Sequence, residues 1–171
     1  MRHVVGDLLE TKDMDVMIHC CNLYHTFGSG LALSIKNKYP EAYTADKITE
    51  RGAEYRLGTF TKTSVDNFTI YNLYAMKGLG NSGHPLGRNL SYDHFYDGIF
   101  RICEDAEKSF DKDRIEIGIP MNFGCCRAGG EWNVVESILW NIESRFPHIE
   151  FVVHELEEAE NDAESTISWE L

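Results

Sequence analysis

The chain has 171 residues, the length of one ordinary domain, and 43% of them are hydrophobic, which is enough for a buried core. Acidic residues outnumber basic ones by 28 to 16, so the formal net charge is -12. This balance argues against a surface that binds nucleic acid or an anionic membrane, because phosphate groups are bound by basic patches. It still allows a small phosphorylated ligand that is held by backbone amides.

The chain contains five cysteines, Cys20, Cys21, Cys103, Cys125 and Cys126, and two pairs of them are adjacent in sequence. We find no signal-peptide pattern and no apolar run of membrane-spanning length, so we expect a cytoplasmic protein with reduced thiols. No CxxC, HExxH or EF-hand pattern occurs, so neither a metal ion nor another cofactor is expected. We also expect a monomer.

The predicted elements begin with a short strand at residues 3–5 and a buried strand at residues 16–20. A helix from residue 29 or 30 ends near Tyr39, because Pro40 disfavours helix in the residue before it. Pro40 then begins a second helix, at residues 41–51, as an N1 proline. Two runs rich in threonine, aromatic and β-branched residues, at residues 58–64 and 67–75, predict a hairpin.

Residues 76–90 contain four glycines and predict a long loop. A helix capped by Ser91 follows, then a strand at residues 115–119, a helix at 131–146 and a strand at 149–153. This alternation predicts an α/β domain over residues 1–156, with about six strands in a mixed sheet and helices on both faces. Residues 157–171 are acidic, and we expect a flexible tail, although docking through Ile167 and Trp169 is an alternative.

Residues 22–32, between the second strand and the first helix, read Asn-Leu-Tyr-His-Thr-Phe-Gly-Ser-Gly-Leu-Ala. Gly28 and Gly30 let the backbone approach a ligand, and the helix start offers unpaired N–H groups. Together they favour an anion site without a basic side chain, the alternative being a turn that needs glycine for its shape only. Leu33 replaces the third glycine of a dinucleotide fingerprint, and no Gly-Lys-Ser/Thr follows, so Rossmann and P-loop sites are rejected.

A second glycine-rich loop, residues 121–132, reads Met-Asn-Phe-Gly-Cys-Cys-Arg-Ala-Gly-Gly-Glu-Trp and also joins a strand to a helix. Ligands of such sheets bind beyond the carboxyl ends of the strands, so both loops should open on the same edge. Two facing loops would suit a ligand with two linked phosphates; the alternative is a plain turn. A cysteine-phosphatase cradle is disfavoured, because Arg127 follows Cys126 immediately.

Four side chains have a chemical and a structural interpretation. Asp7 would accept a hydrogen bond from an adenine amino group or cap a turn, and Asn22 would bind a ribose hydroxyl or stabilise its own loop. His25 would transfer protons near neutral pH or lie exposed in the loop. Glu131 would supply a carboxylate or simply favour a helix start.

Three stretches, residues 6–9, 19–32 and 124–132, resemble the macrodomain family in order and spacing, and the pattern of elements agrees from residue 2 to about 156. The closest resemblance is to the stand-alone branch that includes ADP-ribose 1''-phosphate phosphatases and terminal ADP-ribose protein glycohydrolases. Residues 21–32 and the Pro-Glu-Ala-Tyr-Thr-Ala-Asp stretch at 40–46 are similar to bacterial and viral members. The resemblance implies a three-layer α/β/α fold that binds ADP-ribose.

The resemblance also implies roles for individual residues. Asp7 would bind adenine, the amides of residues 28–31 and 124–128 would hold the diphosphate, and Asn22 and His25 would border the distal ribose. The implied ligand-binding set is Gly6, Asp7, Leu8, Asn22, Phe27, Gly28, Ser29, Gly30, Leu31, Asn122, Phe123, Gly124, Cys125, Cys126, Arg127 and Ala128. The implied catalytic set is Asn22, His25 and Glu131.

The chain departs from the family pattern at Phe27 (usually methionine), Cys126 (glycine), Glu131 (aspartate) and Ala128. Ala128 stands where the glycohydrolase branch carries its catalytic aspartate, which favours hydrolysis of ADP-ribose 1''-phosphate to ADP-ribose and phosphate. The alternatives are a hydrolase that removes ADP-ribose from protein or nucleic acid, and a non-catalytic binder of an ADP-ribose-type small molecule. Retained His25 and Glu131 favour an enzyme over a binder.

Overall fold

The computed structural model describes residues 1–78 and 88–157. Within these ranges six strands form one sheet in the order β1-β6-β5-β2-β4-β3, in which β3 is antiparallel to β4 and the other neighbours are parallel. The mixed six-stranded sheet predicted from the sequence is therefore confirmed. The strands are β1 (Arg2–Val5), β2 (Val16–Asn22), β3 (Phe60–Val65), β4 (Phe68–Met76), β5 (Ile115–Pro120) and β6 (Ile149–Glu155).

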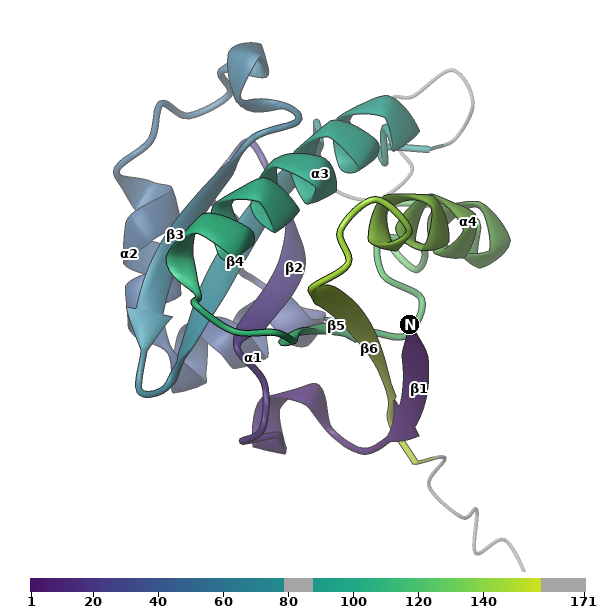
Figure 1. The fold of residues 1–171 in the computed structure, drawn as a ribbon. Helices are drawn as coiled ribbons and strands as arrows, with labels where there is room; N and C mark the ends of the chain where they lie inside the picture. Colours follow the sequence, from purple (N-terminus) through teal and green to yellow (C-terminus); the bar gives the residue numbers. More distant parts are fainter. Residues whose placement is uncertain (79–87, 158–171) are drawn as a thin grey trace, which may run out of the picture.

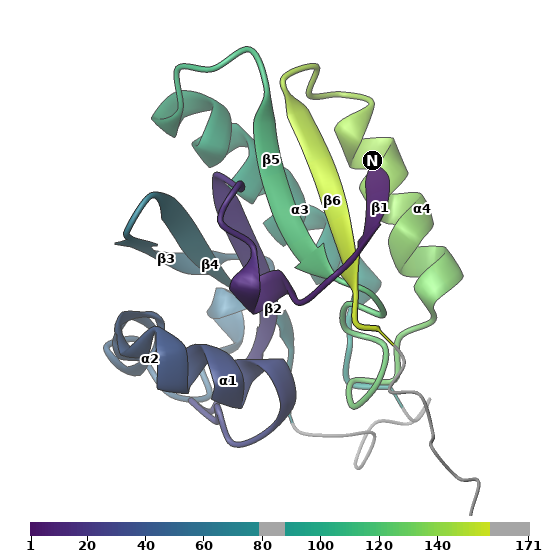
Figure 2. The same ribbon diagram turned by 90° about the horizontal axis from the view of Figure 1, so that it is seen from below.

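Helices cover both faces of the sheet and complete the predicted three layers (Figures 1 and 2). One face carries α3 and α4, and the other carries α1 and α2. The helices are α1 (Gly30–Lys38), α2 (Pro40–Lys47), α3 (Tyr92–Ser109) and α4 (Trp132–Glu143), with short 3₁₀ turns η1 (Leu8–Glu10) and η2 (Glu54–Arg56).

The main core lies between the sheet and the α3–α4 layer. On α3 the buried residues Phe95, Ile99, Ile102 and Ala106 recur at helical spacing, and the Ser91 hydroxyl caps the helix by accepting the His94 amide. Residues 68–75 of β4 are buried without alternation, as expected for a strand covered on both faces. A rigid sheet of this kind gives the loops at its carboxyl edge a fixed base.

Two helices end earlier than predicted. α2 ends at Lys47 instead of residue 51, because the chain turns there and the Gly52 amide donates to the Leu23 carbonyl at 2.7 Å. α4 ends at Glu143 instead of residue 146, four residues before Pro147, which disfavours helix in the residue preceding it.

Two predictions fall on residues that are not described. Of the predicted loop at residues 76–90, residues 79–87 lie outside the described ranges, while its ends, Met76 and Leu90, meet in an isolated antiparallel bridge. Of the predicted acidic tail, only Glu157 is described, so the domain boundary near residue 156 stays a prediction.

Candidate functional site

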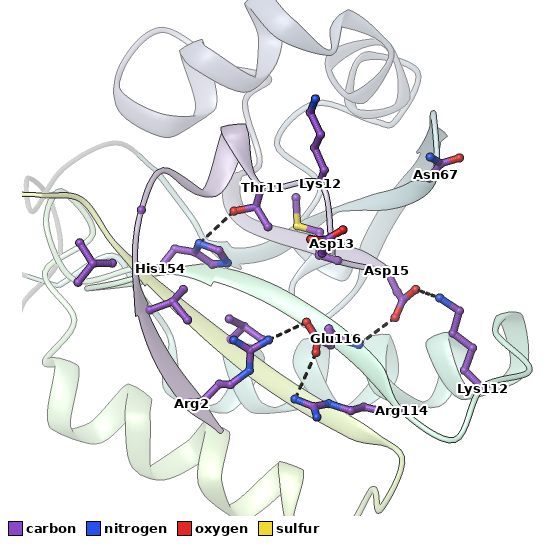
Figure 3. A pocket seen from close by; sticks show the side chains of 15 residues that line it. Arg2, Thr11, Lys12, Asp13, Asp15, Asn67, Lys112, Arg114, Glu116 and His154 are labelled. Atoms are coloured by element: carbon purple, nitrogen blue, oxygen red, sulfur yellow. Dashed lines mark hydrogen bonds and ion pairs between the residues drawn. The ribbon is translucent and has the colours of Figure 1, made fainter.

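Two hollows among the described residues bear on function. The larger is a groove of about 690 Å³, lined by residues of β1, β5 and β6 on the sheet face opposite α3 and α4. Its charged side chains are largely paired with one another, as Figure 3 shows. Arg2 contacts Glu116 at 2.8 Å, Arg114 contacts the same carboxylate at 3.2 Å, and Lys112 is paired with Asp15. Of the predicted ligand-binding residues only Gly6 lines this groove. We therefore do not take the groove as the candidate site.

The smaller hollow, a pocket of about 310 Å³, lies at the carboxyl edge of the sheet. Both glycine-rich loops line it, which confirms that they open on the same edge. The lining residues are His19, Cys20, Cys21, Asn22, Thr26, Phe27, Ser29, Gly30, Leu31, Ala32, Met76, Gly78, Pro120, Met121, Asn122, Phe123, Gly124, Cys125, Cys126, Arg127 and Ala128. We call this cavity the loop pocket.

The first wall of the loop pocket is the start of α1. Gly30 begins the helix with a φ of 56°, and no heavy atom lies within 4 Å of the position that a Cβ atom would occupy there. The Leu33 amide is the first of the helix to donate to the turn before it, to the Ser29 carbonyl at 3.4 Å. The amides of residues 30–32 precede this bond and are available to an anion.

The second wall is the loop between β5 and α4. Asn122 and Gly124 have φ values of 58° and 71°, and the Gly130 amide closes the loop by donating to the Gly124 carbonyl at 3.2 Å. A Cβ atom on Gly124 would lie only 3.0 Å from the Leu90 side chain. Residue 124 therefore needs glycine both for its left-handed backbone and for its packing.

The charge of the loop pocket is unusual for so acidic a chain. Among the described residues no Asp or Glu lines it, and Arg127 is the one Lys or Arg in its lining. Arg127 Nη1 donates to Ser29 Oγ at 2.7 Å and so connects the two loops. An anion in this pocket meets a guanidinium, backbone amides and a helix start, with no carboxylate to repel it.

The three predicted catalytic residues are not brought together. Asn22 lines the pocket, and its side chain is held within the loop, where Oδ1 accepts the Tyr24 amide at 2.8 Å and Nδ2 donates to Thr26. His25 does not line the pocket; its ring turns toward α2, and its side chain is 6% exposed. Glu131 is exposed at the N-cap of α4 and is also absent from the lining.

The predicted adenine end is also separate from the loop pocket. Asp7 caps η1, because Oδ1 accepts the Leu9 amide at 2.8 Å, so the structural interpretation of this residue is confirmed. Gly6, Leu8 and Gly28 do not line the loop pocket either. The remaining predicted ligand-binding residues do line it, and contact with a ligand stays a prediction for all of them.

Sequence reasoning missed His19, which lines the pocket from β2. It is 2% exposed, and Nε2 lies 2.6 Å from Oδ1 of Asn72, whose amide nitrogen is engaged by two acceptors. Nε2 of His19 therefore carries the proton. Burial lowers the pKa of His19 to about 4, so the ring is neutral at pH 7. A histidine inside an apolar strand was the available signal.

Four of the five cysteines line the pocket, yet none forms a disulfide. Burial raises the pKa of the Cys20 thiol strongly and that of Cys125 to about 11. Both thiols are protonated at neutral pH and are poor nucleophiles. Among the described residues, no group of three His, Cys, Asp or Glu side chains is placed to hold a metal ion.

No protein-family model matches the chain. It is 27% identical over 150 residues to an uncharacterised 17.5 kDa protein of Enterobacteria phage T4, a match that covers 85% of this chain and 91% of that protein. A shorter match, 46% identical over 39 residues, is to an ADP-ribose 1''-phosphate phosphatase of Aspergillus clavatus and covers 23% of this chain and 20% of that protein.

Solved structures decide the fold. The macrodomain of Mycobacterium tuberculosis DarG superimposes with a TM-score of 0.72 at 22% identity, over 90% of this chain and 97% of that one. This chain has the macrodomain fold. Thermosipho africanus DarTG in complex with ADP-ribose superimposes with a TM-score of 0.66 at 16% identity, over 90% of this macrodomain and 41% of that chain. Within the described residues of the macrodomain, no helix has the length and apolar character needed to cross a membrane.

Proposed function

We propose that this macrodomain binds ADP-ribose in the loop pocket. The observation that carries the proposal is the absence of carboxylates from the described lining of a pocket in a chain of net charge -12, together with one arginine that joins its two walls. A diphosphate is favoured in a pocket whose lining contains no carboxylates, because carboxylates would repel its negative charges. The Thermosipho africanus structure, which has the same fold, contains ADP-ribose.

In this proposal the diphosphate lies between the amides of residues 30–32 and the Arg127 guanidinium. The distal ribose lies toward Asn22 and Thr26, whose side chains already hydrogen bond to each other. The adenine extends toward Asp7, which has one oxygen engaged by the Leu9 amide.

We further propose that the protein hydrolyses ADP-ribose 1''-phosphate. The short matches to phosphatases of this name, 46% and 40% identical over 39 and 43 residues, support this activity. Ala128 in the pocket wall supports it as well, because the resemblance places the aspartate of the glycohydrolase branch there. Phosphoryl transfer depends mainly on positioning and charge stabilisation. In this proposal Arg127 and the loop amides hold the diphosphate, and Asn22 and Thr26 position the distal ribose that carries the reacting phosphate.

Binding is tested by calorimetry with ADP-ribose in the presence of a chelator. Arg127→Ala should weaken binding by about 1.5–3 kcal/mol, the usual contribution of a hydrogen bond to a charged group. Arg114→Ala is the matched control, since it removes the same charge from the exposed groove and should leave the affinity unchanged. Equal affinity in both variants would contradict the proposed diphosphate site.

Catalysis is tested by incubating the protein with ADP-ribose 1''-phosphate and, separately, with ADP-ribosylated protein and nucleic acid. We expect phosphate release from the first substrate, and we expect Asn22→Ala to impair both release and affinity. Release of ADP-ribose from a macromolecule alone would identify an ADP-ribosyl hydrolase instead. Tight binding without any product would leave the non-catalytic binder.

A further inference from the structure

A buried charged cluster contacts the loop that follows β2 and supplies part of the loop-pocket lining. Asp46 of α2 has no exposed surface, and its oxygen Oδ1 accepts Arg56 Nη2 at 2.9 Å and the Tyr74 hydroxyl at 2.8 Å. The Arg56 guanidinium also stacks on the Tyr74 ring at 3.9 Å. Oδ1 is therefore engaged by partners from η2 and β4, which fix the carboxylate in the core.

The other oxygen of Asp46 faces the loop. Oδ2 lies 2.9 Å from His25 Nδ1, and because a carboxylate only accepts, Nδ1 carries the donated proton. The ring is 21 residues away in sequence and comes from the loop that connects β2 to α1. Oδ1 of Asp46 thus accepts hydrogen bonds from residues of the core, whereas Oδ2 accepts one from the loop between β2 and α1.

His25 has a backbone conformation that needs such support. Its φ is 60°, in the left-handed region, which non-glycine residues occupy only at a cost. On either side of it, Asn22 and Thr26 contribute to the pocket lining, and α1 begins five residues later, at Gly30. A change of backbone at His25 would therefore move both the ribose-facing side chains and the helix start.

We infer that His25 is a positioning residue that fixes the pocket loop to the buried Asp46 carboxylate, and that it does not transfer protons. The inference rests on the proposed ADP-ribose site, whose affinity it explains. His25 is absent from the pocket lining and its side chain is only 6% exposed, so the second ring nitrogen, Nε2, is not presented to a ligand in the pocket. His25 therefore affects the ligand through the loop. While His25 Nδ1 donates to Asp46 Oδ2, the loop amides and the Asn22 side chain keep the conformation that binds the ligand.

Three variants separate this role from acid–base catalysis. His25→Ala removes the contact. His25→Asn restores it, because the Asn amide nitrogen takes the place of Nδ1 and asparagine tolerates a positive φ, yet an amide transfers no proton. Tyr74→Phe is the matched control, since it removes a hydrogen bond from Oδ1 of the same carboxylate and leaves Oδ2 facing His25.

We expect His25→Ala to lower ADP-ribose affinity about tenfold, which corresponds to a loop that adopts its binding conformation about a tenth of the time. His25→Asn should regain affinity and phosphate release to within a few-fold of the unmodified protein, and Tyr74→Phe should bind normally. His25→Ala at saturating substrate should keep most of its turnover. If His25→Ala keeps its affinity but loses turnover, and His25→Asn does not restore it, His25 is an acid–base residue and the inference is wrong.

Hydrogen exchange of the amides at residues 23–30, measured without ligand, keeps the inference separate from the proposed function. These amides should exchange faster in His25→Ala than in the unmodified protein, His25→Asn or Tyr74→Phe. Equal exchange in all four proteins overturns the inference even if ADP-ribose binds. Failure of the unmodified protein to bind ADP-ribose overturns the proposed function, while the exchange result still decides whether His25 holds the loop.

Discussion

Acidification should destabilise this protein through His19, and the size of the effect follows from its burial. The ordinary pKa of a histidine is 6.5, and burial lowers that of His19 to about 4 in the folded state. Between these pH values the unfolded chain binds a proton that the folded chain does not. The stability contribution is therefore complete above about pH 6.5 and is lost as the pH falls toward 4.

The shift from 6.5 to about 4 is 2.5 pKa units. At 1.36 kcal/mol for each unit, the loss is about 3 kcal/mol. Domains of this kind are stable by about 5–15 kcal/mol in total, so one histidine accounts for a substantial share of the stability.

The measurement is urea unfolding at several pH values between 7 and 4, for the unmodified protein and for His19→Gln. The Gln amide nitrogen takes the place of Nε2 and keeps the bond to Asn72, but glutamine does not titrate. All other titrating groups are shared, so the difference between the two proteins isolates His19. Equal losses of stability in both proteins would refute the reasoning, because the buried ring would then be protonated without cost.

Three further predictions follow from packing and charge. Gly98→Ala places a Cβ atom 2.1 Å from Leu73 Cδ1, so urea unfolding should show a loss of about 1–3 kcal/mol from overpacking. Asp46→Ala leaves Arg56 buried without its partner and should cost about 3–5 kcal/mol in the same assay, whereas adding Arg56→Met should cost less than the sum of the single changes. Gly30→Val puts a β-branched side chain into the loop pocket and strains the start of α1, where φ is 56°, so calorimetry should show no binding of ADP-ribose while circular dichroism shows a folded protein.

The sequence predicted the sheet well because buried strands are local apolar runs, and all six appear where they were expected. Strand polarity also placed both glycine loops at one edge. It did not predict the direction of the His25 ring, which depends on a left-handed backbone and on Asp46, 21 residues away. The end of α2 was wrong for a similar reason, since the contact between Gly52 and Leu23 outweighs local helix preference.

The position of β1 has a consequence for synthesis on the ribosome. β1 pairs with β6 alone, in register from Arg2 with Val152 to Val5 with Glu155, so the first strand to be made waits for the last. At translation rates of about 5–20 residues per second, that wait is roughly 7–30 s. During this interval β2, β4 and β5 can assemble, but the edge of β5 that receives β6 stays open to other chains. Nascent protein is therefore most exposed to aggregation just before the final strand emerges.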